Sequence, residues 1–141
     1  MSQSKHELLI KYAWAFIGKP YIWGGDDPMK GFDCSGFIIE LLRSIGILPI
    51  SGDWTAQGLW NKFQDRYSTE YPGKSTVVFY GKSKDRITHV MLCLDEQYCI
   101  GAAGGDSRVN TEADAIRYNA YVKVLPIKYR KDVVSYLDFG V

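Results

Sequence analysis

The hydrophobic pattern of the chain changes its period at Pro72-Gly73, and this change constrains the fold more than any other feature. Before it, apolar residues recur at helical spacing; after it, β-branched and aromatic runs are separated by polar turns. Helices followed by strands predict an α+β domain, in which helices pack on one antiparallel sheet. Because the 141 residues contain no repeat or linker, we expect residues 1–141 to form a single domain.

Three helices are expected in the first half of the chain. Ser4 is a suitable N-cap for the first, which Gly18 and Pro20 end, and its apolar stripe comprises Leu8, Tyr12, Ala15 and Phe16. The second gives the clearest signal: Asp33 is the N-cap, Gly46 lies where a C′ glycine belongs, and the apolar stripe comprises Phe37, Ile38, Leu41, Leu42 and Ile45. A shorter third helix is expected near Thr55–Phe63, with Asp53 as its candidate cap.

Four strands are expected in the second half, at Thr76–Tyr80, Ile87–Leu94, Tyr98–Ala102 and Tyr121–Ile127. A tight turn at Asp95-Glu96-Gln97 joins the second strand to the third. The tail, residues 128–141, contains apolar side chains that either pack on the domain or dock to a partner.

Charge and composition exclude several classes of function. The 17 basic and 16 acidic residues give a net charge of +1, so no partner role for nucleic acid is expected. Three cysteines cannot form a fully paired disulfide framework. No apolar run approaches the ~20 residues that span a bilayer, so we expect no membrane insertion. The first residues lack a signal-peptide pattern, which predicts a cytoplasmic protein as synthesised, whose export would need another route.

Cys34 directly follows the predicted cap Asp33, so its sulfur lies in the first turn of a helix. Unpaired N–H groups and the helix dipole favour an anion there, and thiol pKa values fall at such positions. A nucleophilic cysteine is the interpretation that this position favours. The alternative is that Cys34 is a small buried hydrophobe, as free cysteines commonly are.

Of the two histidines, His89 is the candidate base for this cysteine. It lies within an apolar strand, whereas His6 lies between Lys5 and Glu7 on an expected solvated face. A cysteine that begins a helix and a histidine on a later strand form the layout of Cys–His nucleophilic catalysis. A metal site is not expected, because His89 and Cys93 lie ~13 Å apart along a regular strand. Cys99 lies opposite Cys93 if the turn is centred on Glu96.

Three motifs carry a resemblance to a known family. The segments Tyr21-Ile-Trp-Gly-Gly, Gly31-Phe-Asp-Cys-Ser-Gly-Phe37 and Ile87-Thr-His-Val90 resemble those of the NlpC-type cell-wall peptidases, which are papain-like cysteine hydrolases. The resemblance covers roughly residues 5 to 105. It implies a papain-like α+β fold, in which the nucleophile helix packs on an antiparallel sheet that carries the base.

The resemblance also implies a function: a cysteine endopeptidase or amidase that cuts peptidoglycan stem peptides, typically after γ-D-glutamate, without a cofactor. Cys34 would be the nucleophile and His89 the base, acting through a thioester. Tyr21 would lie near the oxyanion, while Asp33 and Ser35 would hold the substrate, Asp33 through a free amine of the stem peptide. Trp23 is expected to line the cleft, with Trp54 a weaker candidate.

The sequence departs from the family at one position. Members usually carry a third polar residue that orients the histidine, and counting along the motif places Gly101 there, which offers only its backbone. Pairing about the turn sets His89 opposite Gly101, Ala102 or Ala103. A main-chain carbonyl or a water is the first expected substitute, and Asp106 the second.

The missing polar side chain at Gly101 keeps an alternative open: a catalytically weak or inactive papain-like module with a structural or binding role, for example in a phage tail. The resemblance to compact members without an export signal suggests a phage-encoded, virion-associated enzyme. Against the inactive module, Tyr21, Asp33, Cys34, Ser35 and His89 are all present together.

Overall fold

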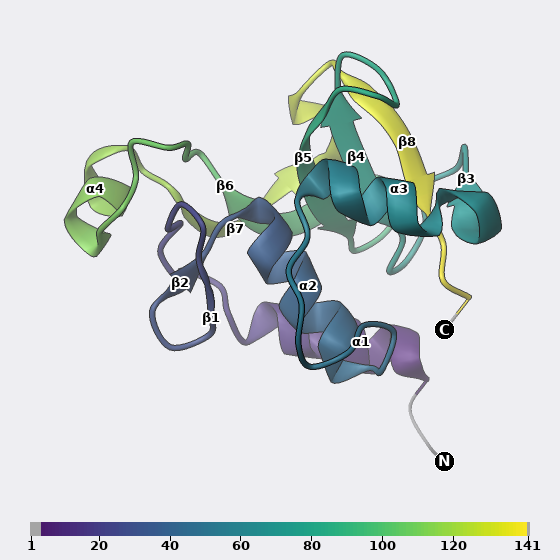
Figure 1. Cartoon of the computed structure of the whole chain (residues 1–141), viewed down its shortest axis with the longest axis horizontal. Helices are drawn as coiled ribbons and strands as arrows, with labels where there is room; N and C mark the ends of the chain where they lie inside the picture. Colours follow the sequence, from purple (N-terminus) through teal and green to yellow (C-terminus); the bar gives the residue numbers. More distant parts are fainter. Residues whose placement is uncertain (1–3, 141) are drawn as a thin grey trace.

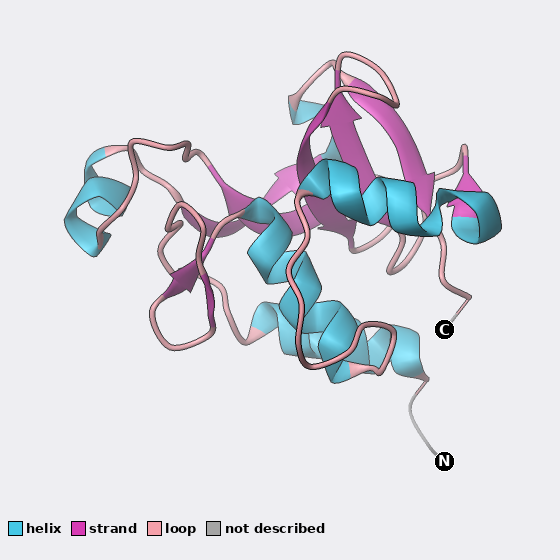
Figure 2. Cartoon of the chain, in the orientation of Figure 1, coloured by secondary structure: helices cyan, strands magenta, loops and turns pink. Residues whose placement is uncertain are grey.

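The computed structural model describes residues 4–140, in which helices cover one face of an antiparallel sheet (Figure 1, Figure 2). The helices are α1 (Lys5–Trp14), α2 (Cys34–Ser44), α3 (Ala56–Tyr67) and α4 (Glu112–Arg117), with a 3-10 turn η1 (Ile127–Tyr129). The strands are β1 (Asp26–Asp27), β2 (Gly31–Phe32), β3 (Ser68–Thr69), β4 (Val77–Gly81), β5 (Ile87–Cys93), β6 (Tyr98–Ala103), β7 (Tyr121–Pro126) and β8 (Val133–Leu137). The expected α+β fold, in which the helix that begins at Cys34 packs on an antiparallel sheet, is confirmed.

The main sheet has six strands in the order β3-β8-β4-β5-β6-β7, and β1 pairs with β2 in a separate hairpin. The four predicted strands agree with β4, β5, β6 and β7 to within a residue at each end. The strand β8, which the sequence did not predict, pairs with both β3 and β4. The tail therefore packs on the domain and completes the sheet.

Alternation along the strands builds two apolar layers. On the helix side, Val77 and Phe79 of β4 join the buried faces of α1, α2 and α3 in the main core. On the opposite side, Val78 and Tyr80 join a smaller cluster with Met91, which the segment beginning at Ile127 covers. The residues that follow β7 thus lie against the far face of the strands that carry the site.

Two details of the predicted helices are wrong. In α1 the buried face is set by Leu9, Ala13 and Phe16, whereas Leu8 and Ala15 are exposed, so the predicted stripe was offset by about one residue. In α3 the cap is Thr55, whose hydroxyl accepts from the Gly58 N–H at 3.0 Å, and the helix continues to Tyr67. Asp53 instead accepts from the next backbone N–H, that of Trp54, at 2.9 Å.

The sheet register at the second hairpin agrees with a turn centred on Glu96. Cys93 is paired with Cys99, and the Asp95 carboxylate accepts from the N–H groups of Gln97 and Tyr98 at 2.7 and 2.8 Å. Both cysteines are fully buried and free. Among residues 4–140, no helix combines the length and apolar character needed to cross a bilayer.

Candidate active site

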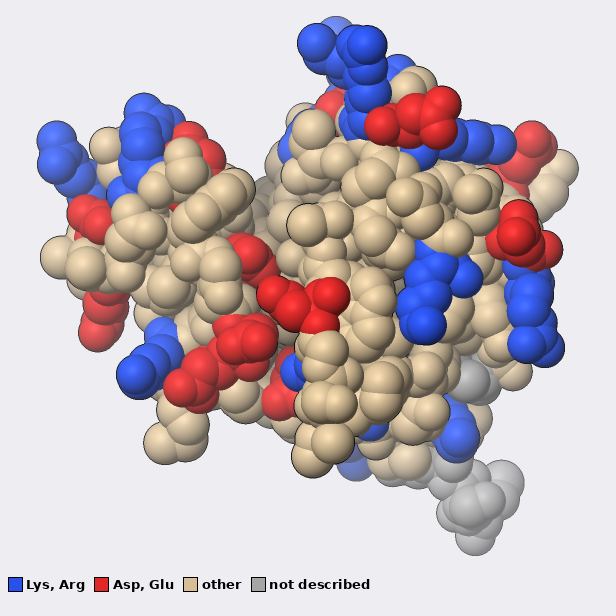
Figure 3. Space-filling model, viewed as in Figure 1, with Lys and Arg blue, Asp and Glu red and all other residues tan. Residues whose placement is uncertain are grey.

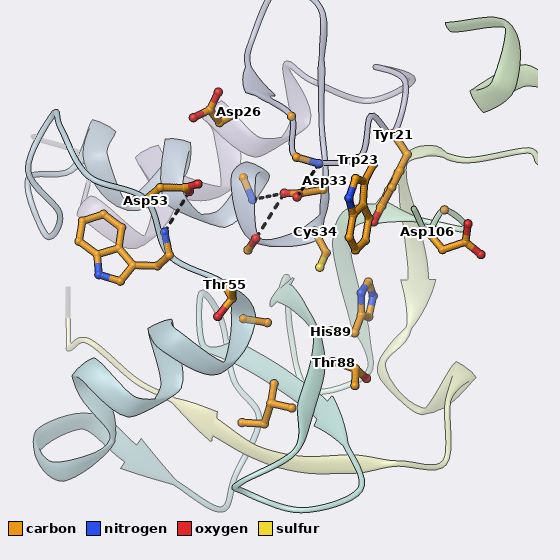
Figure 4. Close-up of a pocket in the computed structure, with 18 of the residues that line it drawn as sticks. Tyr21, Trp23, Asp26, Asp33, Cys34, Asp53, Thr55, Thr88, His89 and Asp106 are labelled. Carbon is orange, nitrogen blue, oxygen red and sulfur yellow. Dashed lines mark hydrogen bonds between the residues drawn. The ribbon is translucent and has the colours of Figure 1, made fainter. Parts of the chain in front are cut away.

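A pocket of about 440 Å³ opens where five segments meet (Figure 4). It is lined by the loop leading into β1, the first turn of α2, the residues leading into α3, the start of β5 and the loop after β6, with Arg130 from the tail. The predicted site residues that line it are Tyr21, Trp23, Asp33, Cys34, Ser35, His89 and Asp106; Trp54, the weaker candidate, does too. Gly101 lies outside this lining.

The first turn of α2 is locked to the preceding loop by the Asp33 carboxylate. As predicted, Asp33 is the N-cap, and its Oδ1 accepts from the Gly36 N–H at 2.7 Å and from the Ser35 hydroxyl at 3.3 Å. Its Oδ2 accepts from the Gly24 N–H at 3.1 Å (Figure 4). Burial raises the pKa of this carboxyl group, while the hydrogen bonds from Gly36, Gly24 and Ser35 lower it. Asp33 thus fixes the position of Cys34.

The loop and the helix approach each other so closely that Gly36 has no room for a side chain. A Cβ on Gly36 would collide with the carbonyl oxygen of Gly25, whose own position is fixed by the Asp33 N–H at 2.9 Å. The obstacle is backbone, so it cannot move aside as a side chain would.

Gly36→Ala is therefore expected to lower the free energy of unfolding by about 1–3 kcal/mol, despite alanine's higher helix propensity. Urea denaturation of the two proteins measures this difference. Gly73→Ala is the matched control, because a Cβ there would meet Thr76 at an ordinary 3.9 Å. Equal stability of Gly36→Ala and the parent would contradict the close approach.

The thiol of Cys34 is not acidified by the helix. Burial raises its pKa to about 11, the Asp33 carboxylate adds to the rise, and backbone groups of Val90 and Ser35 oppose it. The expectation of a lowered pKa is thus wrong, because loss of hydration outweighs the helix N-terminus here. At neutral pH the site holds a protonated thiol.

His89 lies at the other side of the pocket, on β5 opposite Tyr80 of β4. Its side chain is 7% exposed, and burial lowers its pKa to about 3, with the positive charge of Arg130 acting in the same direction and Asp132 against it. The imidazole is therefore neutral at pH 7 and able to accept a proton. Figure 4 shows it facing the same space as the Cys34 sulfur.

The aromatic residues of the loop form one wall of the pocket. Tyr21 is buried, and its ring lies so close to Gly105 that a Cβ there would overlap it. Burial, with the neighbouring Cys34, raises the pKa of Tyr21, so its phenol stays protonated. Trp23 is 52% exposed at the rim, as expected for a residue that lines a cleft.

Among residues 4–140, no hydrogen bond joins His89 to Gly101, to Asp106 or to a main-chain carbonyl. Gly101 pairs with Lys123 of β7, and a Cβ on it would lie 2.5 Å from the Met91 sulfur, which occupies the adjoining space. Asp106 lines the pocket, but its carboxylate is bound by Arg108 at 2.8–3.1 Å. The observed side-chain hydrogen bond of His89 therefore goes to a residue other than the expected Gly101 and Asp106.

The partner of His89 is Tyr129, whose hydroxyl lies 2.8 Å from the imidazole Nε2. Sequence reasoning missed Tyr129, because it lies 40 positions after His89, in a tail that matched no motif. It also missed Arg130, which lines the pocket. No spacing rule would have found either residue; the only signal was the apolar pattern of the tail, which indicated packing.

Carboxylates dominate the charge of the pocket. Asp26, Asp33, Asp53 and Asp106 line it, and among the described residues Arg130 is the one lysine or arginine that does. The Arg130 guanidinium is paired with Asp132 at 2.6 Å and also donates to the Thr88 hydroxyl at 3.3 Å. Figure 3 shows acidic side chains gathered in the middle of this face, between the α4 end of the molecule and α3, with basic ones mostly farther out.

Metal ligands do not gather anywhere in residues 4–140: no group of three or more His, Cys, Asp or Glu side chains could hold an ion. The chemistry that the pocket offers is that of a thiol, a neutral imidazole and helix-terminal N–H groups. A helix that begins at a cysteine, packed on an antiparallel sheet that carries a histidine, places the protein in the papain-like class.

Comparison with known proteins narrows this class. The sequence profile of the NlpC/P60 family matches residues 18–126, and the chain belongs to this family. The resemblance found in the motifs is thus confirmed. The chain is 32% identical over 91 residues to the bifunctional muramidase/DL-endopeptidase CwlT of Bacillus subtilis; the match covers 63% of this chain and 26% of that protein.

Solved structures share the fold. An NlpC/P60 family protein from Bacillus cereus matches with a TM-score of 0.74 and 20% identity, over 99% of this chain and 41% of that one. RipD of Mycobacterium tuberculosis is described as a non-catalytic NlpC/p60 domain protein adapted to peptidoglycan binding. It matches with a TM-score of 0.69 and 19% identity, over 99% of this chain and 100% of that one. The chain spans about a quarter of CwlT and less than half of the B. cereus protein.

Proposed function

We propose that the chain is a cysteine endopeptidase that hydrolyses peptidoglycan stem peptides, at the bond after γ-D-glutamate, and that residues 1–141 form its single catalytic domain. The observation that carries the proposal is the pocket that Cys34 and His89 line together, with Asp33 and Tyr21 also in its lining. The name of CwlT, a DL-endopeptidase, supports the choice of bond.

Catalysis starts from an uncharged Cys34 thiol and an uncharged His89 imidazole. Because the Cys34 thiol has a raised pKa and the His89 imidazole a lowered one, the proton moves to His89 only as the sulfur attacks the substrate carbonyl. A C–S bond forms, and the oxyanion is held by unpaired N–H groups at the start of α2 and by the Tyr21 hydroxyl.

The remaining steps return the enzyme to its starting state. The imidazolium of His89 gives its proton to the leaving amine as the C–N bond breaks, which leaves a thioester on Cys34. Water, deprotonated by His89, then attacks the thioester carbonyl. The acid is released, and the sulfur recovers its proton.

The carboxylates of the pocket suit a substrate with a free amine. Asp33 uses three of its roughly four acceptor positions inside the protein, which leaves one on Oδ2 for an ammonium donor. Asp26, Asp53 and Asp106 add negative charge around it. We therefore propose Asp33 as the group that binds the amine of a stem peptide, with Ser35 supporting it and Trp23 packing on the peptide.

The test is digestion of purified peptidoglycan followed by muropeptide analysis by mass spectrometry. The expected products carry a γ-D-glutamate with a free carboxyl group on one side and a new amino terminus on the other. Cys34→Ala is the matched control and is expected to release none of them. Products cut elsewhere in the stem would contradict the proposed bond.

A second candidate is a papain-like module that binds peptidoglycan without cutting it, as RipD is described to do. The observation that favours it is Met91, whose sulfur fills the space beside Gly101. This is the position at which family members usually carry the polar residue that orients the histidine. Sedimentation of the protein with peptidoglycan, without released muropeptides, is the result that this candidate predicts. A phage-encoded, virion-associated role belongs with either candidate.

A further inference from the structure

We propose that Tyr129 is the positioning residue of the active site: its hydroxyl holds the His89 imidazole in the tautomer that leaves Nδ1 free to take the Cys34 proton. The inference rests on the proposed function for its catalytic consequence. Its structural content, the tautomer of His89, stands independently of any activity.

The contact between the two side chains is direct. The Tyr129 hydroxyl lies 2.8 Å from Nε2 of His89, within the range of a good hydrogen bond. Since this contact occupies Nε2, only Nδ1 remains to face Cys34. Burial raises the pKa of Tyr129 to about 12, so its hydroxyl stays protonated at neutral pH. The lone pairs of a protonated hydroxyl oxygen are still able to accept the Nε2–H.

The direction of this hydrogen bond determines whether His89 can act as a base. A neutral imidazole has one N–H, so Nδ1 has a free lone pair only when Nε2 carries the proton. Nε2 must then donate to the Tyr129 oxygen. After proton transfer the same bond holds the imidazolium, whose Nε2–H still has its acceptor.

Tyr129 is held firmly enough for this task. It belongs to the turn η1, whose first residue, Ile127, is buried and donates its N–H to the Gln97 carbonyl at 2.7 Å. The Ile127 carbonyl accepts from the Tyr80 hydroxyl at 2.7 Å. The Tyr80 ring in turn contacts both partners, with centroids 5.4 Å from His89 and 5.7 Å from Tyr129.

Arg130, the residue after Tyr129, anchors the C-terminal side of this segment. Arg130 pairs with Asp132 and lies over the Tyr80 ring at 5.4 Å, and the Asp132 carbonyl accepts from the Gly81 N–H at 2.9 Å. The segment is therefore tied at its first end to β4 and to the turn before β6, and at its other end to β4. An orienting group supplied from this segment explains why Gly101 carries no side chain and why Met91 can occupy its space.

The variant Tyr129→Phe tests the inference, because it removes the hydroxyl of Tyr129 and keeps the ring. Tyr136→Phe is the matched control, because Tyr136 is a tyrosine on β8 that belongs to the apolar cluster of Tyr80 and Ile127. The first readout is the tautomer of His89 from long-range ¹⁵N–¹H spectra at pH 7. The chain has only two histidines, so His89→Gln identifies the signals.

In the parent and in Tyr136→Phe, His89 is expected to be protonated at Nε2; in Tyr129→Phe, the two tautomers are expected to mix. Protonation at Nδ1 in the parent, or an unchanged tautomer in Tyr129→Phe, would overturn the inference even if no substrate is ever cleaved.

The second readout is steady-state hydrolysis of a stem peptide. Tyr129→Phe is expected to lower kcat about 10- to 100-fold, as loss of one orienting hydrogen bond does elsewhere, with KM within about twofold. A loss of kcat/KM that comes from a higher KM, with kcat unchanged, would indicate that Tyr129 contacts the substrate. That result would overturn the positioning role. An inactive parent with the expected tautomers would instead refute the proposed function and leave the orientation of His89 established.

Discussion

Cys34→Ala is expected to reduce stem-peptide hydrolysis by about 10⁴-fold or more, because no other group at the pocket can form the thioester. His89→Ala is expected to lose a similar factor. The Cys34 thiol is protonated at neutral pH, so without His89 nothing takes its proton as the sulfur attacks. The measurement is the initial rate with a defined stem peptide at pH 7.

Two controls sharpen this prediction. Cys93→Ala removes another thiol, fully buried away from the pocket, and is expected to keep the activity of the parent. The double variant Cys34→Ala with His89→Ala should be no slower than either single variant, because the two residues act as a unit. Additive losses, or substantial activity in Cys34→Ala, would refute the Cys–His mechanism.

Acid is expected to destabilise the protein through His89. The folded protein holds this imidazole at a pKa of about 3, whereas the unfolded chain restores it to about 6.5. The unfolded state therefore binds the proton more readily. The stabilisation is fully present above pH 6.5 and is lost as the pH falls toward 3, at up to about 1.4 kcal/mol per pH unit.

Urea denaturation between pH 8 and pH 4 measures this effect, with His89→Gln as the matched variant. Below pH 6.5 the free energy of unfolding of the parent is expected to fall more steeply than that of His89→Gln. Other groups titrate in both proteins, so the difference in slope reports His89. Parallel curves would mean that His89 keeps an ordinary pKa when folded.

Local chemistry made the nucleophile helix predictable. The Asp33 cap, the apolar stripe and Gly46 all lie within one stretch of chain, and the structure places α2 at Cys34–Ser44 with Asp33 as its N-cap. The strand pattern from Thr76 onward was likewise visible, because alternation and turn residues act over short range. The cysteine and the histidine therefore came from sequence alone as candidate site residues.

What could not be predicted depends on contacts between distant segments. The strand β8 pairs with β4, about 55 residues before it, and its register is set by that pairing. Tyr129 reaches His89 for the same reason: the tail passes under β4 and β5, and no local pattern records where it goes.

The prediction of a lowered pKa for the Cys34 thiol failed for a related reason. The helix N-terminus that favours a thiolate at Cys34 is a local feature, whereas the burial that opposes it depends on the tertiary packing around the thiol. The helices, four of the strands and the candidate nucleophile thus follow from local rules, whereas the electrostatics and the orientation of the candidate base follow from packing.

The central claim, that Cys34 is the nucleophile and is neutral at rest, has one direct test. The protein is treated with iodoacetamide at several pH values, and labelling of each cysteine by peptide mapping is followed in parallel with loss of hydrolysis. Cys93 and Cys99 are 0% exposed and should not react in the folded protein. The account predicts that activity disappears in step with Cys34 labelling, and that the labelling rate keeps rising above pH 9. Full hydrolysis by protein alkylated at Cys34, or a labelling rate that levels off below pH 8, would contradict it.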